Sequence, residues 1–107
     1  MIAQLELNNV ILDIKTILSQ NPAPVKRIGV FGSLAKGQIH EKSDIDIAIE
    51  YDPGEDYDFN RFVDFCEICE ALRESIADIY NRKIDIVHVE EGEDNFLDEI
   101  RREVVWI

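Results

Sequence analysis

Two stretches of sequence decide the fold of this chain: Gly32-Ser33-Leu34-Ala35-Lys36-Gly37 and, shortly after it, Ser43-Asp44-Ile45-Asp46. The first follows residues 28–31, a short apolar run rich in β-forming residues that predicts a buried strand. The second leads into residues 44–51, where polar and apolar residues alternate without a break. This alternation predicts a strand that carries on one face Ile45, Ile47, Ile49 and Tyr51. A tight turn with a single helical turn is therefore expected between two strands.

Helices are predicted on either side of these strands. Residues 7–18 place apolar side chains three and four positions apart, and the proline-containing stretch 21–24 ends that helix. A long helix is expected to begin with Asp58 as its N-cap, with Tyr57 and Phe62 as a hydrophobic staple. Its apolar stripe is predicted to consist of Phe59, Phe62, Cys66, Cys69, Leu72, Ile76 and Ile79.

The remainder of the chain predicts a third strand over residues 84–89, a loop over residues 90–93 and a last helix capped by Asp94 or Asn95. The apolar positions of that last helix are Phe96, Leu97, Ile100, Val104 and Val105. Helices thus alternate with strands, which predicts an α/β fold in which a small mixed β-sheet is flanked by helices.

Acidic residues outnumber basic ones: among 107 residues, Asp and Glu total 23, Lys and Arg total 11, and the formal net charge is −12. This balance argues against a free-standing nucleic-acid binder, because clustered Lys and Arg hold phosphate backbones, and against binding to anionic membranes. The sequence has no apolar run that would suit a membrane helix and no secretory signal at residues 1–6. Its two cysteines fit a reducing compartment, so a cytoplasmic protein is expected.

Two carboxylates stand out at the start of the alternating strand. Asp44 and Asp46 are two positions apart, so their side chains project from the same face. Two neighbouring carboxylates repel one another, and partial burial makes the repulsion more costly. Such a pair favours a cation, and ligands that are all oxygen favour Mg²⁺, Mn²⁺ or Ca²⁺. The alternative is an exposed sheet edge at which both aspartates simply face water.

The Gly32-Ser33 pair makes the metal-binding interpretation more attractive. A glycine directly after a buried strand lets backbone N–H groups approach an anion closely. The Ser33 hydroxyl could add a donor to a phosphate oxygen. Taken alone, a Gly-Ser pair usually marks only a turn. Here it leaves one strand while the two carboxylates begin the next, and a phosphate cradle beside a metal-binding pair suits metal-assisted phosphoryl or nucleotidyl transfer.

The two stretches together resemble the signature of the minimal nucleotidyltransferases, small members of the polymerase-β-like nucleotidyltransferase superfamily. In that family Gly-Ser is followed by ten residues and then Asp-x-Asp, and here Gly32-Ser33 is followed by residues 34–43 and Asp44-Ile45-Asp46. The family also has a third acid on a later strand, which Asp85 matches. The resemblance covers nearly the whole chain and implies a nucleotidyltransferase fold in a single domain, residues 1–107.

Metal-dependent catalysis is what this resemblance implies, and the chemistry of the residues agrees with it. Asp44 and Asp46 would hold two Mg²⁺ ions, about 3.5–4 Å apart in sites of this kind. One ion would neutralise the phosphates of ATP, and the other, shared with Asp85, would lower the pKa of the attacking hydroxyl. Gly32 and Ser33 would bind the departing phosphates.

Lys36 is the remaining expected phosphate contact. Many relatives have Arg at the position of Lys36, and Tyr or Arg at the position of Leu34. Lysine keeps the positive charge but lacks the bidentate fork of arginine. Lys36 would therefore give a point contact to phosphate.

The resemblance also implies a partner and a biological role. Small members of the family are typically encoded beside a HEPN-type toxin and act as antitoxins that transfer AMP from ATP to a toxin tyrosine. The implied function is thus adenylylation of a HEPN toxin, within a hetero-oligomer. The alternative is a catalytically silent module that neutralises the toxin by binding. Transfer onto nucleic acid is disfavoured by the charge of −12 and by the lack of room for a further domain.

Several other residues have simpler structural interpretations. Cys66 and Cys69 both lie on the predicted apolar stripe of the long helix, so two buried thiols are expected rather than a zinc or redox site. His88 is expected to be packed or at a partner surface, facing away from Asp85. For His40, a substrate contact and plain solvent exposure are both open.

The surplus acidic residues after the second strand are expected to form a solvated strand end and loop: Glu50, Asp52, Glu55, Asp56 and Asp58. A docking surface for a basic partner is the alternative. At the end of the chain, Trp106 and Ile107 either pack back onto the domain or insert into a partner.

Overall fold

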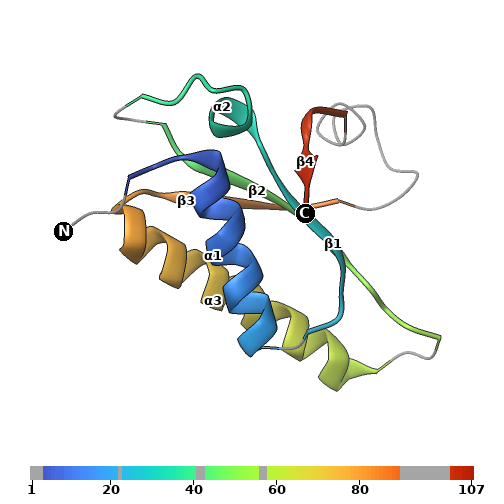
Figure 1. The fold of residues 1–107 in the computed structure, drawn as a ribbon. Coiled ribbons are helices and arrows are strands. Elements are labelled where there is room, and N and C mark those ends of the chain that lie inside the picture. The colour runs from blue at the N-terminus through green and yellow to red at the C-terminus, as the bar shows by residue number, and fades with distance from the viewer. Residues whose placement is uncertain (1–3, 22, 41–42, 56–57, 90–101) are drawn as a thin grey trace.

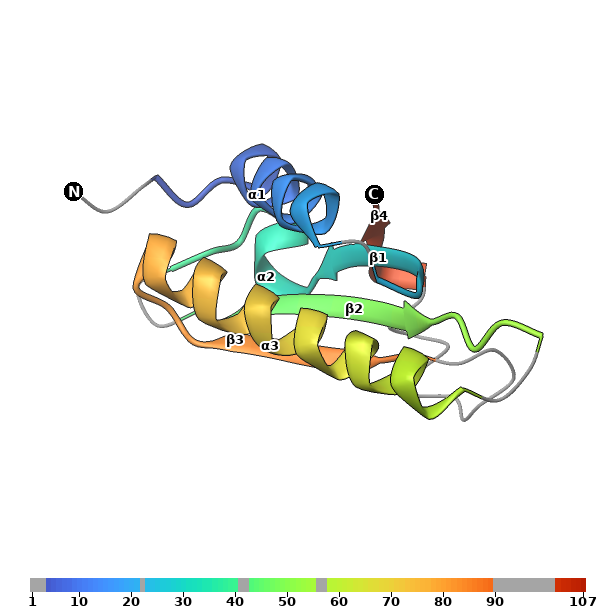
Figure 2. The same ribbon diagram turned by 90° about the horizontal axis from the view of Figure 1, so that it is seen from below.

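The computed structural model describes residues 4–21, 23–40, 43–55, 58–89 and 102–107. The elements in chain order are α1 (Leu7–Gln20), β1 (Val25–Phe31), α2 (Gly32–Ala35), β2 (Ile45–Tyr51), α3 (Phe59–Tyr80), β3 (Ile84–His88) and β4 (Val105–Trp106). Figure 1 shows α1 and α3 together on one face of the sheet, and Figure 2 shows the same arrangement from below. No helix in these ranges is long and apolar enough to cross a membrane.

The four strands form one mixed sheet in the order β3-β2-β1-β4. Strand β1 is antiparallel to both β2 and β4, whereas β2 and β3 are parallel. Parallel neighbours need a crossover connection, and α3 provides it between β2 and β3. The predicted α/β class, a small mixed sheet flanked by helices, is confirmed.

Strand β2 lies inside the sheet and separates two chemically different faces. Ile45, Ile47 and Ile49 are fully buried in the main core with residues of α1 and α3. Because side chains alternate along a strand, Asp46 and Glu50 lie on the opposite face. The alternation read from the sequence therefore assigns each side chain of β2 to the correct face.

Helix α1 contributes Val10 and Ile14 to this core, both fully buried. A hydrogen bond from the Tyr80 hydroxyl to the Asp13 carboxylate joins α1 to the end of α3. Burial, together with this carboxylate, raises the pKa of Tyr80 above its usual range. The two helices are thus held together by apolar packing and by the hydrogen bond from the neutral Tyr80 hydroxyl to the Asp13 carboxylate.

The beginning of α3 is as predicted. Asp58 is the N-cap, and its side-chain oxygen accepts a hydrogen bond of 2.9 Å from the backbone N–H of Asn60. Tyr57, the other half of the proposed staple with Phe62, lies outside the described residues. Phe62 instead packs beside Tyr51, with ring centroids 5.7 Å apart.

The predicted apolar stripe of α3 is partly wrong. The residues that α3 buries are Phe65, Ile68, Cys69, Leu72, Ile76 and Tyr80. Phe59 is 61% exposed and Phe62 45% exposed, and Cys66 and Ile79 also lie on the exposed side. Apolar residues occupy more than half of the circumference of this helix, so spacing alone does not settle which side faces the sheet. The expectation of two buried thiols holds for Cys69 and fails for Cys66.

The end of the chain is also different from the prediction. Val104 and Val105 were expected in a helix, but Val105–Trp106 forms strand β4 against β1. Gly29 permits this pairing, because a Cβ atom there would lie 2.4 Å from Val104 and 2.6 Å from the carbonyl of Val105. The predicted loop 90–93 and the first positions of the predicted helix, Phe96, Leu97 and Ile100, lie outside the described residues.

Glu50 was expected to be solvated, and this expectation is wrong. Glu50 is only 5% exposed, and its carboxylate pairs with Arg27 at 3.0 Å and with Lys26 at 3.3 Å. Burial by itself would raise the pKa of Glu50, but the hydrogen bonds and charges of Arg27 and Lys26 outweigh burial and lower it. The Arg27 guanidinium also lies 4.2 Å from the ring centre of Trp106, so Trp106 packs back onto the domain.

We expect Glu50→Gln to lower the free energy of unfolding by about 1–2 kcal/mol at pH 7, because it removes the negative charge and one of the two oxygens that pair with Arg27 and Lys26. A carboxyl group whose pKa is lowered by folding stabilises the protein above its unfolded pKa, and this stabilisation is lost as the pH falls through the folded pKa. The difference between wild type and variant should therefore shrink below pH ~4. Urea unfolding at several pH values measures it.

The control is Glu67→Gln, which removes the same charge from the exposed surface of α3. If both variants lose equal stability at pH 7, the buried ion pairs of Glu50 contribute nothing of their own.

Candidate functional site

Two of the predicted carboxylates face each other across neighbouring strands. Asp46 of β2 is in register with Asp85 of β3 in the parallel pair. Both lie on the face of the sheet opposite α1 and α3, since Ile45, Ile47 and Ile84 are buried on the helix-covered face. Asp44 directly precedes β2. All three side chains are partly exposed, so the carboxylates lie at the surface of the sheet.

These carboxylates form one electrostatic cluster. Burial raises the pKa of Asp46, and the negative charges of Asp85 and Asp44 raise it further. Lys83 pairs with Asp85 at 3.6 Å, but the lysine side chain is 73% exposed, so solvent weakens this compensation. The site therefore concentrates negative charge around Asp46.

The Gly-Ser turn is in direct contact with this cluster. Phe31, the last residue of β1, is in register with Asp46, and the chain then enters α2 at Gly32 with a φ of +71°. A Cβ atom at residue 32 would lie 2.2 Å from Oδ2 of Asp46. Residue 32 must therefore be glycine for two reasons, its left-handed backbone and the close approach of the carboxylate. The two halves of the sequence motif thus meet in space.

Ser33 and Lys36 follow in the same short turn. The carbonyl oxygen of Ser33 accepts a 2.8 Å hydrogen bond from the backbone N–H of Gln38, which closes the turn. Lys36 is at the end of α2, and its ammonium group pairs with Glu103 at 3.5 Å, both side chains being about half exposed. Gly32 thus lies against Asp46, the centre of the acidic cluster, whereas Lys36 contacts the end of the chain.

Sequence reasoning missed the residues that hold this region in place. Arg82 donates hydrogen bonds to the carbonyl oxygens of His40 and Ser43, just before Asp44. Lys83 could have been found from its position two residues before Asp85 on the same side of a strand. Arg82 and Glu103 give no sequence signal, because their contacts join segments far apart in the chain.

The donor set has the chemistry of a site for a hard divalent cation, being made only of carboxylate oxygens. Within the described ranges no three Asp, Glu, His or Cys side chains are grouped so that they could hold a metal ion together. Mg²⁺ does not need such a group: it is commonly held by one or two carboxylates together with substrate phosphates and water. Asp46 and its acidic neighbours therefore fit an open site that a bound nucleotide would complete.

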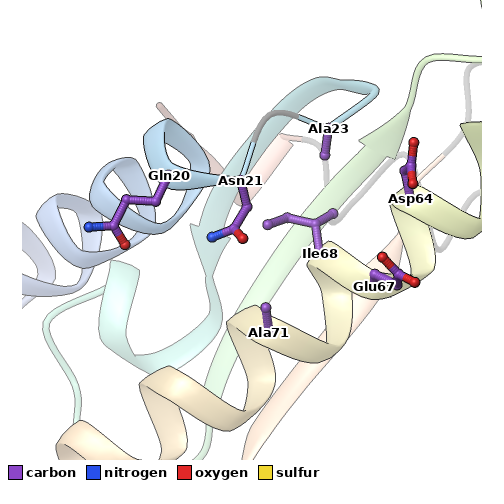
Figure 3. A pocket seen from close by; sticks show the side chains of 7 residues that line it. All are labelled: Gln20, Asn21, Ala23, Asp64, Glu67, Ile68 and Ala71. Atoms are coloured by element: carbon purple, nitrogen blue, oxygen red, sulfur yellow. The ribbon is translucent and has the colours of Figure 1, made fainter.

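Hollows elsewhere on the surface are not part of this site. One, of about 340 Å³, lies between the end of α1 and α3, where Figure 3 shows its lining of Gln20, Asn21, Ala23, Asp64, Glu67, Ile68 and Ala71. None of these seven residues belongs to the predicted site. Carboxylates and a glycine turn are the kinds of group that suit metal and phosphate, and this hollow contains neither the three aspartates nor the Gly-Ser turn.

The other candidate residues have packing roles. His88 packs edge-on against Phe65, with ring centres 5.1 Å apart, and its Nε2 lies 3.9 Å from the thiol of Cys69. Burial raises the pKa of Cys69 to about 11, which disfavours the reactive thiolate. The carbonyl oxygen of His40 accepts a hydrogen bond from Arg82.

Comparison with known sequences identifies relatives. The family profile described as polymerase beta, nucleotidyltransferase matches residues 13–107. A candidate protein adenylyltransferase of Methanocaldococcus jannaschii is 32% identical over 78 residues, which cover 73% of this chain and 77% of that protein. A second one from the same organism is 34% identical over 82 residues, covering 77% of this chain and 74% of its own length.

Solved structures share the fold. One, described as a candidate minimal nucleotidyltransferase, matches with a TM-score of 0.65 and 21% identity, covering 96% of this chain and 97% of that chain. A chain in the structure of a tri-AMPylated Shewanella oneidensis HEPN toxin with its MNT antitoxin matches with a TM-score of 0.55 and 17% identity, covering 94% and 70%. The family profile and the relatives of more than 30% identity agree with the position of the glycine turn against Asp46. This chain belongs to the polymerase-β nucleotidyltransferase family.

Proposed function

We propose that this protein transfers AMP from ATP to a hydroxyl group of a partner protein, using Mg²⁺ held by its carboxylates. The observation that carries the proposal is the contact between Gly32 and Asp46, which brings a phosphate-binding turn against the acidic cluster. The relatives support the choice of acceptor, since two of them carry the name of protein adenylyltransferases. The partner we propose is a HEPN-type toxin, in keeping with a fold neighbour from a complex of that kind.

The proposed reaction is a single displacement at the α-phosphorus of ATP. The acceptor oxygen, a tyrosine hydroxyl in our proposal, forms a bond to the α-phosphorus, and the bond from that phosphorus to the bridging oxygen of pyrophosphate breaks. The hydroxyl proton is released, and AMP remains on the acceptor. Mg²⁺, when bound, neutralises phosphate charge and lowers the pKa of the attacking hydroxyl.

Each residue of the site has a role in this scheme. Asp44, Asp46 and Asp85 supply the negative oxygen ligands that draw the cations to the sheet. Gly32 and Ser33 bind the phosphates that leave, because the glycine keeps the turn close to Asp46. Lys36 contributes a point charge once nucleotide competes with Glu103 for its ammonium group.

The first test is the intact mass of the partner protein after incubation with ATP, Mg²⁺ and this protein. We expect one or more additions of AMP, abolished in the double variant Asp44→Asn, Asp46→Asn, since neutral amides are poor ligands for Mg²⁺. The partner's toxicity is scored in parallel. If its mass never changes and the double variant suppresses toxicity as well as wild type does, neutralisation is by binding alone and the enzymatic proposal fails.

A second test separates contact with Asp46 from backbone strain. Gly32→Ala places a methyl group where only 2.2 Å separates it from the Asp46 carboxylate, so we expect nearly complete loss of AMP transfer. Gly37→Ala is the matched control: its φ of +70° imposes the same strain, of about 1–2 kcal/mol, but no atom lies within 4 Å of the added carbon. The AMP-transfer rates of the two variants are compared below both of their melting temperatures. Equal losses of rate would mean that the contact with Asp46 has no catalytic importance.

The raised pKa of Asp46 gives a third test, made without metal. An acid whose pKa is raised by folding destabilises the protein as the pH rises past its unfolded pKa, because its charged form is disfavoured in the fold. Asp46→Asn should therefore raise the melting temperature in EDTA at pH 7 by about 2–5 °C, and the gain should shrink towards pH 4.

Asp78→Asn, which removes an exposed charge from α3, is the control for net charge in that experiment. A lower melting temperature for Asp46→Asn than for Asp78→Asn at pH 7 would show that the Asp46 carboxylate stabilises the metal-free fold, contrary to its raised pKa.

A further inference from the structure

The turn between α3 and β3 makes a second set of contacts with the site. Asn81 ends α3 in a left-handed conformation, with φ of 52°, and the two residues after it reach back to the segment before β2. One terminal nitrogen of Arg82 donates to the carbonyl oxygens of both His40 and Ser43. The carbonyl oxygen of Lys83 accepts a 3.0 Å hydrogen bond from the backbone N–H of Ile45.

These contacts fix the backbone on both sides of Asp44. Ser43, the residue before it, is 7% exposed and gives its carbonyl oxygen to Arg82 at 2.9 Å. Ile45, the residue after it, is fully buried and bonded to Lys83. Asp44 itself is outside β2, so the strand ladder does not hold it, and its direction depends on these two anchors.

His40 and Ser43, the two residues that Arg82 contacts, are also hydrogen-bonded to each other. The backbone N–H of Ser43 donates to the carbonyl oxygen of His40 at 2.9 Å, and the Ser43 hydroxyl accepts from the backbone N–H of His40 at 3.0 Å. Arg82 adds a cationic donor to the carbonyl oxygens of both residues. Hydrogen bonds from charged donors are stronger than those from neutral donors. Without Arg82, the two carbonyl oxygens lose a shared donor, and His40 and Ser43 lose their link to the residues after α3.

We infer that Arg82 is a positioning residue for the reaction: it aims Asp44 at the site through its hydrogen bonds to His40 and Ser43. The same chain turn leads directly to Asp85 on β3, so the residues after α3 act on the positions of Asp44 and Asp85 at once. Arg82 touches no substrate in this scheme and acts only through the backbone. The inference rests on the proposed AMP transfer, but the contacts that carry it are independent of that proposal.

The test compares three variants of the full chain with wild type. Arg82→Met keeps an unbranched side chain and removes the donors; Arg82→Lys keeps a cationic donor. Arg73→Met is the matched control, because Arg73 is exposed and pairs with Glu70 of its own helix at 2.8 Å. All are assayed well below the lowest melting temperature, with kcat and the KM for ATP measured separately.

We expect Arg82→Met to lower kcat about 10- to 100-fold, the usual effect of losing a group that orients a ligand residue, with a smaller change in KM. Arg82→Lys should recover most of that loss, and Arg73→Met should match wild type. Amide hydrogen exchange, which needs no substrate, should accelerate in Arg82→Met in peptides covering residues 43–46 and stay unchanged in α1. Titration with Mn²⁺ alone should show weaker binding by the same variant.

Ser43→Ala provides a second route if Arg82→Met fails to fold, since it removes the hydroxyl that accepts a hydrogen bond from His40 and leaves Arg82 in place. It should lower kcat and speed the same amide exchange. The inference is overturned if the folded variants at both positions retain wild-type kcat and exchange, or if Arg73→Met loses as much as Arg82→Met. If wild type transfers no AMP, the proposed function fails, while exchange and Mn²⁺ binding still decide the role of Arg82.

Discussion

The contact between Gly32 and the Asp46 carboxylate is the constraint on which the rest of this structure depends. It requires β1 and β2 to be adjacent, in the register that places Phe31 opposite Asp46. It also requires Asp46 to face away from the helices, which the buried isoleucines of β2 ensure. A slip of one residue would turn the carboxylate into the core and the isoleucines out to water. Core packing and site geometry are therefore specified by the same seven-residue strand.

Much of this arrangement could be predicted from the sequence, because β2 and its neighbours follow simple local rules. The period of two in β2, the apolar spacing in α1 and the N-cap at Asp58 each depend on residues close together in the chain. The spacing between Gly32-Ser33 and the two aspartates also predicts that the two halves of the motif lie close together, since strands joined by a short connection pair readily. The family resemblance and the physical reading of these residues agree for this reason.

The predictions that failed depend on contacts between distant segments. Phe59 and Phe62 satisfy the helical spacing as well as Phe65 does, and only the position of the sheet distinguishes them. Val104 and Val105 suit a helix or a strand, and the absence of a side chain at Gly29 allows the strand. Glu50 was grouped with solvated acids because its cations, Lys26 and Arg27, belong to the neighbouring strand. In each case the deciding partner is remote in sequence.

The packing of Trp106 has a practical consequence. This residue is the chain's one tryptophan, and its ring lies against Arg27, which is itself tied to buried Glu50. Strand β4 begins two residues after Glu103, the ion-pair partner of Lys36 beside the glycine turn. Intrinsic fluorescence excited at the indole thus comes from a single known position at the edge of the sheet. Movement of the chain's end at the Lys36 contact would change the surroundings of that indole, so the protein carries its own optical probe and needs no added label.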